Sequence, residues 1–275
     1  MKNIFKSLFI SGFPVFAIVI FVKTIINTNF NLDDISILIS SLTIVLFFAM
    51  LFIKPVARTT KNLAPYSFII LISALLSLFD FNRNVLLINT SLALGWLAYL
   101  KWYSSFKKRE KNSLEVGKVL PNFTLENSKK EQIETATLNG DYKIFLFYRG
   151  NWCPLCMAQI KEVVNQYKEL EKRNVDMILI SSQPHKFTEN IANKHKIPFH
   201  FLVDVNNKVA KRLKIYHKNG LPTGFQALGY DSDVIMPTVI ITDENNTIIF
   251  ADLTDNYRVR PEPDTFLKII DKHKL

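Results

Sequence analysis

The sequence of 275 residues has only two cysteines, Cys153 and Cys156. A structural disulfide framework needs several bridges and is therefore excluded. Two cysteines are also too few for a zinc site with four cysteine ligands. A site with two cysteines and two histidines is not expected, because the nearest histidine, His185, has no partner at ligand spacing, so we predict no metal. The pair is either a reactive dithiol or two bystanders.

The second half of the sequence lacks a strong charge imbalance. Residues 112–275 hold 22 Lys and Arg against 20 Asp and Glu, whereas residues 1–111 hold 12 against 4. Nucleic-acid binding needs a basic surface on a folded domain, so we expect no nucleic-acid partner. The excess positive charge lies instead beside apolar segments, where short basic loops are typical of membrane topology.

Apolar segments fill most of residues 1–111. They run over residues 8–26, 35–53, 63–79 and 85–100. A helix that crosses the hydrocarbon core needs about 20 apolar residues, so we expect a transmembrane region of about four helices. The last two segments are shorter, and a helical hairpin that does not fully cross is the alternative. The first segment could also be a signal peptide, but it lacks a clear small-residue cleavage site.

The loop charges predict an orientation. The N-terminal end and the second loop are basic, the first loop is acidic, and the third is neutral. The segment after the last span holds Lys101, Lys107, Lys108, Arg109 and Lys111. Because basic loops face the cytoplasm, the pattern predicts a multi-pass protein of the cell membrane, in contact with the lipid bilayer, with residues 112–275 on the cytoplasmic side. A miscounted span would place them outside.

Residues 112–275 have the pattern of an α/β domain. Short apolar runs predict buried strands at 143–148, 175–180 and 199–203. Apolar residues at helical spacing predict helices at 154–173, 187–195, 207–213 and 263–273. The segments 238–242 and 247–251 flank a polar turn and predict a hairpin. This order predicts a mixed sheet flanked by helices.

The two cysteines lie where a strand gives way to a helix. Pro154 suits the first helical position, where a missing N–H costs nothing. The dipole and free N–H groups of a helix start stabilise a thiolate, so Cys153 is the predicted nucleophile. Cys156 lies one turn later and can resolve a mixed disulfide or sulfenic acid on Cys153. Two buried structural cysteines are the alternative. The strand, the Trp-Cys-Pro turn and the helix together favour redox chemistry.

The segment Phe147-Tyr-Arg-Gly-Asn-Trp-Cys-Pro-Leu-Cys156 resembles the peroxiredoxin-like branch of the thioredoxin superfamily, the alkyl hydroperoxide reductases and thiol-specific antioxidant proteins. Residues 116–125, 178–184 and 236–238 resemble other parts of those domains, and the similarity covers about residues 114–272. It implies a thioredoxin-like fold and an oxidoreductase that uses Cys153 and Cys156 without a metal or organic cofactor. It also implies a peroxide or protein disulfide as substrate, and a thioredoxin-like protein or low-molecular-weight thiol as reductant.

Several neighbours gain predicted roles from this resemblance. Pro237, if it follows a cis bond, would place a backbone edge beside the sulfurs, although only about 5–6% of X–Pro bonds are cis. Trp152 is predicted to shape the surface on which a partner docks. Typical peroxiredoxins have Thr or Ser where Gly150 stands and Arg where Met236 stands. Arg149 could replace that charge, or could be a solvent-exposed residue at the strand end.

Other interpretations of the dithiol remain open. A membrane-tethered redox sensor or docking protein would use it as a switch. A carrier of electrons across the membrane is disfavoured because the spans hold no cysteine. A copper-delivery domain is disfavoured because no histidine is firmly placed. Arg258 and Arg260 could face the site, but a surface or ion-paired position is the favoured interpretation.

Overall fold

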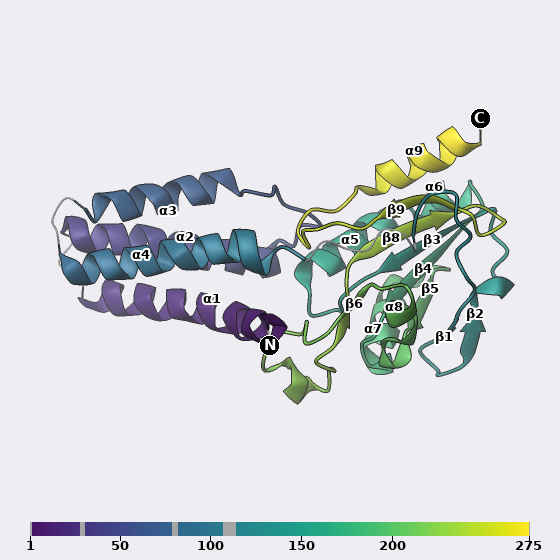
Figure 1. Cartoon of the computed structure of the whole chain (residues 1–275), viewed down its shortest axis with the longest axis horizontal. Helices are drawn as coiled ribbons and strands as arrows, with labels where there is room; N and C mark the ends of the chain where they lie inside the picture. The colour runs from purple at the N-terminus through teal and green to yellow at the C-terminus, as the bar shows by residue number, and fades with distance from the viewer. Residues whose placement is uncertain (1, 28–30, 79–81, 107–113, 275) are drawn as a thin grey trace.

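The chain forms a helical bundle and an α/β domain that lie end to end, as Figure 1 shows. The computed structural model describes residues 2–27, 31–78, 82–106 and 114–274. The predicted boundary between residues 111 and 112 lies outside the described residues, as do Asp80 and the basic cluster from Lys107 to Lys111.

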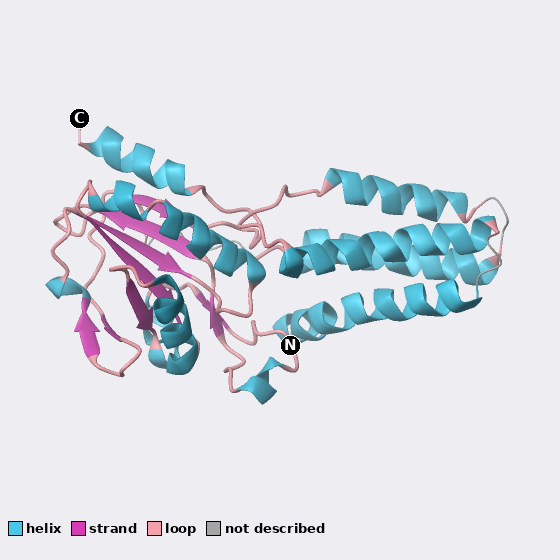
Figure 2. Cartoon of the chain, turned by 180° about the vertical axis from the view of Figure 1, so that it is seen from behind, coloured by secondary structure: helices cyan, strands magenta, loops and turns pink. Residues whose placement is uncertain are grey.

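Four helices run alternately away from and toward the α/β domain (Figure 2). They are α1 (Lys2–Asn27), α2 (Leu32–Ile53), α3 (Ala64–Leu76) and α4 (Arg83–Leu97), the last continued by a π-helix over Ala98–Tyr103. Asn31 caps α2, because its side chain accepts a hydrogen bond from the N–H of Asp34 at 2.8 Å. The second predicted span therefore begins close to its predicted start.

The region has the expected four apolar helices, although they differ in length. Among the described residues, three helices are long and apolar enough to cross a membrane, over Asn3–Asn27, Leu32–Ile53 and Arg83–Tyr103. Helix α3 has 13 residues, which correspond to about 20 Å at the α-helical rise. The hydrocarbon core is about 30 Å thick, so α3 fills the bundle without the length of a full span.

The α/β domain is built on a sheet with the strand order β2-β1-β5-β4-β3-β8-β9. Its strands are β1 (Thr124–Glu126), β2 (Gln132–Glu134), β3 (Tyr142–Phe147), β4 (Val175–Ser181), β5 (His200–Val203), β8 (Thr238–Thr242) and β9 (Ile248–Asp252). β3, β4 and β5 are parallel, and β8 pairs antiparallel with β3 and β9. The short strands β6 (Tyr216–His217) and β7 (Val234–Ile235) form a separate pair.

Helices cover this sheet, so the predicted mixed α/β fold is confirmed. They are α5 (Pro154–Asn165), α6 (Tyr167–Glu171), α7 (His185–His195), α8 (Lys208–Arg212) and α9 (Pro263–His273). The helix predicted at 154–173 is divided at Gln166, whose backbone lies outside the helical region. β1, β2, β6 and β7 were not predicted, because strands of two or three residues have too few positions for a periodic pattern.

The bundle and the domain share one hydrophobic core. Phe47 and Tyr99 of the bundle belong to the same buried cluster as Cys153, Cys156 and Ile160 of the domain. Helix α2 also packs against α5, the helix that begins at the dithiol. The helical bundle thus covers the end of the domain at which the two cysteines lie.

Candidate active site

The dithiol lies after a turn that joins the central strand β3 to α5. Gly150 in this turn has φ +146°, and a Cβ there would lie 2.5 Å from Nε1 of Trp152. The side-chain Oε1 of Gln183 accepts a hydrogen bond from the N–H of Asn151 at 2.8 Å. The turn therefore requires glycine at residue 150, which leaves no room for the hydroxyl side chain that peroxiredoxins carry at this position.

Both cysteines are reduced and buried at the start of α5. Cys153 is the N-cap and Pro154 occupies the first turn, as the sequence predicts. The carbonyl of Cys153 accepts hydrogen bonds from the N–H groups of Cys156 and Met157 at 3.0 and 3.1 Å. Only 2% of Cys153 and 0% of Cys156 are exposed to solvent. A substrate as large as a protein disulfide can reach these sulfurs only after a local opening.

Arg260 places a guanidinium against both sulfurs. Its Nη1 and Nη2 lie 3.4 and 3.5 Å from Sγ of Cys156, and Nη2 lies 4.0 Å from Sγ of Cys153. Its Nε donates to the carbonyl of Tyr257 at 2.9 Å, and its Nη1 donates to Oε1 of Gln159 at 2.9 Å. These bonds fix the charge in place, so it can stabilise a thiolate without reorganisation.

The two thiols are pushed in opposite directions by this environment. Burial, the hydrogen bond to Cys156 and the charge of that neighbour raise the pKa of Cys153 above its usual range. Burial also opposes ionisation of Cys156, but the hydrogen bond from Cys153 and the charge of Arg260 hold the pKa of Cys156 below its usual range. Of the two thiols, Cys156 is therefore the one that this environment favours as the thiolate.

The interpretation of Arg258 and Arg260 as surface or ion-paired residues is wrong. They are 0% and 5% exposed, and neither has a carboxylate within ion-pair distance among the described residues. Arg260 lies 104 residues after Cys156 in the chain, so only folding brings the two together. Sequence patterns singled out both arginines but could not orient them, and they did not single out Gln159 or Tyr257.

Arg149 is also buried, which excludes a solvent-exposed position at the strand end. It is 5% exposed, and its Nη2 donates to the carbonyl of Gly220 at 2.6 Å. Its guanidinium carbon lies 4.6 Å from the ring centroid of Trp152 and 5.5 Å from that of Tyr257. Trp152 is partly buried, and its ring centroid lies 5.9 Å from that of Phe225. Arg149 and Trp152 thus form one stacked group beside the dithiol.

Pro237 lies between β7 and β8, at the edge of the same site. Thr238 pairs with Phe147 across β8 and β3, so Pro237 lies beside the chain that leads to the dithiol turn. The peptide bond before Pro237 is trans, so the cis condition attached to its predicted role is not met. The residue is in the predicted place, but with the geometry of an ordinary X–Pro bond.

The chain was compared with known proteins. The model of the AhpC/TSA family matches residues 116–251. Thiol-disulfide oxidoreductase ResA of Bacillus subtilis (strain 168) is 28% identical over 146 residues, 53% of this chain and 76% of ResA. ResA of Bacillus anthracis is 24% identical over 144 residues, 52% of this chain and 78% of that protein. The match to this family model supports a peroxiredoxin-like domain of thioredoxin fold. The chain is a peroxiredoxin-like oxidoreductase, and this family implies a thiol reductant and a disulfide or peroxide as substrate.

Solved structures were compared as well. AhpC of Enterococcus faecalis is 15% identical, and the match covers 58% of this chain and 93% of that chain with a TM-score of 0.47. The mitochondrial 2-Cys peroxiredoxin of Plasmodium falciparum is 22% identical, and the match covers 58% and 94% with a TM-score of 0.44. Arg260 lies beyond residue 251, so the guanidinium at the sulfurs comes from outside the matched AhpC/TSA domain.

We predict that Arg260→Gln moves thiol reactivity to higher pH. Without the guanidinium, the first ionisation of the dithiol is less favoured, so its apparent pKa rises and the curve of alkylation rate against pH shifts upward. A shift of one unit lowers the thiolate fraction about tenfold below the midpoint. Iodoacetamide labelling of the full chain in detergent, followed by mass spectrometry, measures the midpoint. Arg212→Gln, at an exposed arginine, is the control. An unchanged midpoint in Arg260→Gln would contradict the role of Arg260.

Proposed function

We propose that the chain is a membrane-anchored oxidoreductase in which the dithiol of Cys153 and Cys156 reduces a protein disulfide. The observation that supports this most is the reduced pair at the start of α5, with Arg260 within 3.5 Å of Cys156 Sγ. The same guanidinium lies 4.0 Å from Cys153 Sγ, so it can stabilise the thiolate that thiol–disulfide exchange needs on either cysteine as the proton moves between them. We propose residues 1–111 as the membrane region and residues 112–275 as the redox domain.

The proposed reaction begins when the site opens and Cys153 passes its proton to the Cys156 thiolate. The Cys153 thiolate then attacks one sulfur of the substrate disulfide, and the other substrate sulfur leaves as a thiolate. Cys156 next attacks Cys153, its proton goes to the departing substrate sulfur, and the Cys153–Cys156 disulfide forms. The dithiol starts with one proton and one negative charge, and both end on the two substrate sulfurs, one as a thiol and the other as a thiolate. A thioredoxin-like protein or a low-molecular-weight thiol then reduces the new disulfide.

The supporting residues have separate proposed roles. Pro154 starts α5 and leaves the helix N-terminus open toward Cys153. Arg149 adds positive charge near Cys153, and Trp152 forms the surface that a partner disulfide meets when the site opens. Pro237, although it follows a trans bond, supplies backbone at the edge of that surface.

Reduction of a peroxide is a second candidate, because the AhpC/TSA family includes peroxidases. The Arg260 guanidinium favours it, since peroxide also reacts with a thiolate. Gly150 disfavours it, because φ +146° and the close Trp152 ring exclude the hydroxyl that orients peroxide in typical peroxiredoxins.

We therefore predict that the full chain in detergent reduces an insulin-type disulfide faster than it reduces hydrogen peroxide. Stopped-flow oxidation of the reduced chain by hydrogen peroxide, followed by Trp fluorescence, is compared with turnover of insulin in the presence of a thiol donor. We expect peroxide to oxidise the chain no faster than it oxidises a small-molecule dithiol. Rapid peroxide oxidation with slow insulin reduction would reverse the order of the two candidates.

We propose that the membrane is the cell membrane and that the domain lies in the cytoplasm. Lys6 lies in the first turns of α1, Lys54 and Lys61 lie in the loop between α2 and α3, and Lys101 lies in the π-helix after α4, whereas α2 starts with two acidic residues at the other end of the bundle. The C-terminus lies at the end of the domain away from the bundle (Figure 1). A C-terminal epitope tag should therefore be protected from protease in intact cells and cleaved only after permeabilisation. Cleavage in intact cells would place the domain outside.

A further inference from the structure

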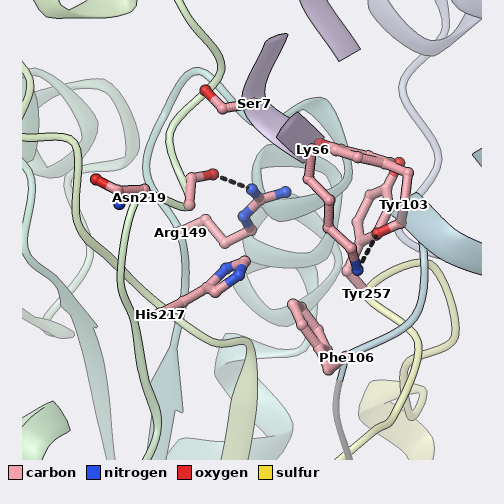
Figure 3. Close-up of a pocket in the computed structure, with 9 residues that line it drawn as sticks. Lys6, Ser7, Tyr103, Phe106, Arg149, His217, Asn219 and Tyr257 are labelled. Atoms are coloured by element: carbon pink, nitrogen blue, oxygen red, sulfur yellow. Dashed lines mark hydrogen bonds between the residues drawn. The ribbon is translucent and has the colours of Figure 1, made fainter. Parts of the chain in front are cut away.

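A small cavity lies between the first membrane helix and the redox domain (Figure 3). Its walls include Lys6 of α1, Tyr103 at the end of the π-helix, and Arg149, His217 and Tyr257 of the domain. The volume of about 10 Å³ is close to what one water-sized group requires. Neither the membrane region nor the domain alone forms this cavity.

Two cations face the cavity without a carboxylate to balance them. The Nζ of Lys6 donates to the carbonyl of Ser105 at 2.6 Å and lies 3.5 Å from that of Tyr103. The Nη2 of Arg149 donates to the carbonyl of Gly220 at 2.6 Å. Within the described part of the chain, neither cation has an acidic side chain at ion-pair distance. Buried charges without a counter-charge are costly, so a mobile anion would stabilise the pair.

One N–H group of the Arg149 side chain has no acceptor. Its Nε is buried and has no hydrogen-bond partner among the described residues, and the residue itself is only 5% exposed. Figure 3 shows its guanidinium at the cavity, with the Lys6 ammonium across from it. A buried N–H of a charged group that lacks an acceptor loses the full free energy of its hydration. An anion in the cavity would accept this bond.

We infer that Lys6 and Arg149 form a binding site for a small monovalent anion of halide size. The cavity holds little more than one water-sized group, so only an anion as small as a halide could enter it. Sulfate and phosphate, with four oxygens each, are too large for it. The walls supply a lysine ammonium and an arginine N–H, which are donors without acceptor capacity, and therefore select an anion over a cation.

The site is coupled to the dithiol through its walls. Arg149 is four residues before Cys153, and Tyr257, which lines the cavity, accepts the hydrogen bond from Nε of the arginine that contacts the sulfurs. Reduced dithiol carries a negative charge that these cations partly balance, whereas the disulfide carries none. The anion therefore binds more tightly to the oxidised chain. By linkage, it lowers the reduction potential of the dithiol.

Binding is tested by 35Cl NMR on the full chain in detergent micelles. We expect a chloride line broadening that bromide reverses and sulfate does not. Lys6→Met should lose the broadening and Lys6→Arg should keep it. Lys23→Met is the matched control, because Lys23 is exposed at the other end of α1. Displacement by sulfate as effective as by bromide, or broadening that persists in Lys6→Met, would overturn the inference. If Lys6→Met does not fold, the selectivity of the unmodified chain decides.

Coupling is tested by redox titration in sodium chloride and in sodium gluconate at equal ionic strength. We expect about tenfold tighter anion binding to the oxidised chain, which corresponds to a potential about 30 mV lower in saturating chloride. The shift should vanish in Lys6→Met and remain in Lys23→Met. Equal potentials in the two salts would refute the coupling. The redox titration rests on the proposed redox function, whereas the NMR binding test does not. A failure of the proposed function can therefore be distinguished from a failure of anion binding.

Discussion

Cys153→Ser should reduce insulin turnover to the uncatalysed background, a loss on the order of 10³-fold or more, as expected when an enzyme loses its nucleophile. Serine keeps the shape of the side chain but cannot form a thiolate near neutral pH. Cys156→Ser should also stop turnover, but at a later step. It leaves the attacking cysteine intact, so a mixed disulfide with the substrate should accumulate on Cys153.

The comparison of Cys153→Ser with Cys156→Ser is needed because the structure has features that favour each cysteine as the nucleophile. Arg260 is closer to Sγ of Cys156, at 3.4 Å, than to Sγ of Cys153, at 4.0 Å. Cys153 is the N-cap residue of α5, although its pKa is raised by burial and by its neighbour Cys156. Mass spectrometry of each variant after incubation with an oxidised peptide identifies the adduct. An adduct that forms on Cys156 in the Cys153→Ser chain, and none in Cys156→Ser, would reverse the assignment.

Arg258→Met should loosen the contact between the bundle and the redox domain and expose the dithiol. Arg258 is fully buried, and its guanidinium donates to Oγ1 of Thr59 at 2.8 Å, to the carbonyls of Thr60 and Lys61 at 3.0 and 2.9 Å, and to Oγ of Ser104 at 2.9 Å. Hydrogen bonds that involve a charged group contribute about 1.5–3 kcal/mol each. Their joint loss should lower the free energy of opening by about 3 kcal/mol or more.

The measured quantity is the rate at which iodoacetamide labels Cys153 in the native chain. About 3 kcal/mol corresponds to roughly a hundredfold larger open population, and labelling should be faster by a similar factor. Thr59→Val removes one acceptor only and should give a smaller, graded effect. Arg212→Met, at an exposed arginine, is the control. If Arg258→Met labels at the control rate while its melting temperature falls, opening does not occur at this contact.

Local sequence patterns were sufficient for most of the redox domain. The central strand, the helix that starts at Pro154, the hairpin around residue 243 and the last helix all appear within a few residues of their predicted bounds. These elements are long, and their apolar residues repeat with the period of the element that they form. Fold class and family followed from the same residues, because the Trp-Cys-Pro turn between strand and helix lies within ten consecutive positions.

Local sequence patterns did not determine where the apolar helices of the bundle end. Apolar residues run from 63 to 79, but α3 starts at Ala64 and ends at Leu76. Hydrophobicity marks which residues avoid water, whereas the helix ends depend on how the chain turns at each side of the bundle. The bounds of the third apolar helix therefore became known only from the structure.

By itself, the sequence determined that this protein has an apolar N-terminal region and an α/β domain with two cysteines at a strand-to-helix turn, since both are encoded by neighbouring residues. Only the tertiary structure decided what surrounds the dithiol. Arg260 reaches the sulfurs from more than a hundred residues away, Arg258 joins the two parts of the chain, and Lys6 meets Arg149 across the same contact. The interaction of two charges depends on their distance in the folded structure, and a local sequence pattern does not show which charges folding will bring together.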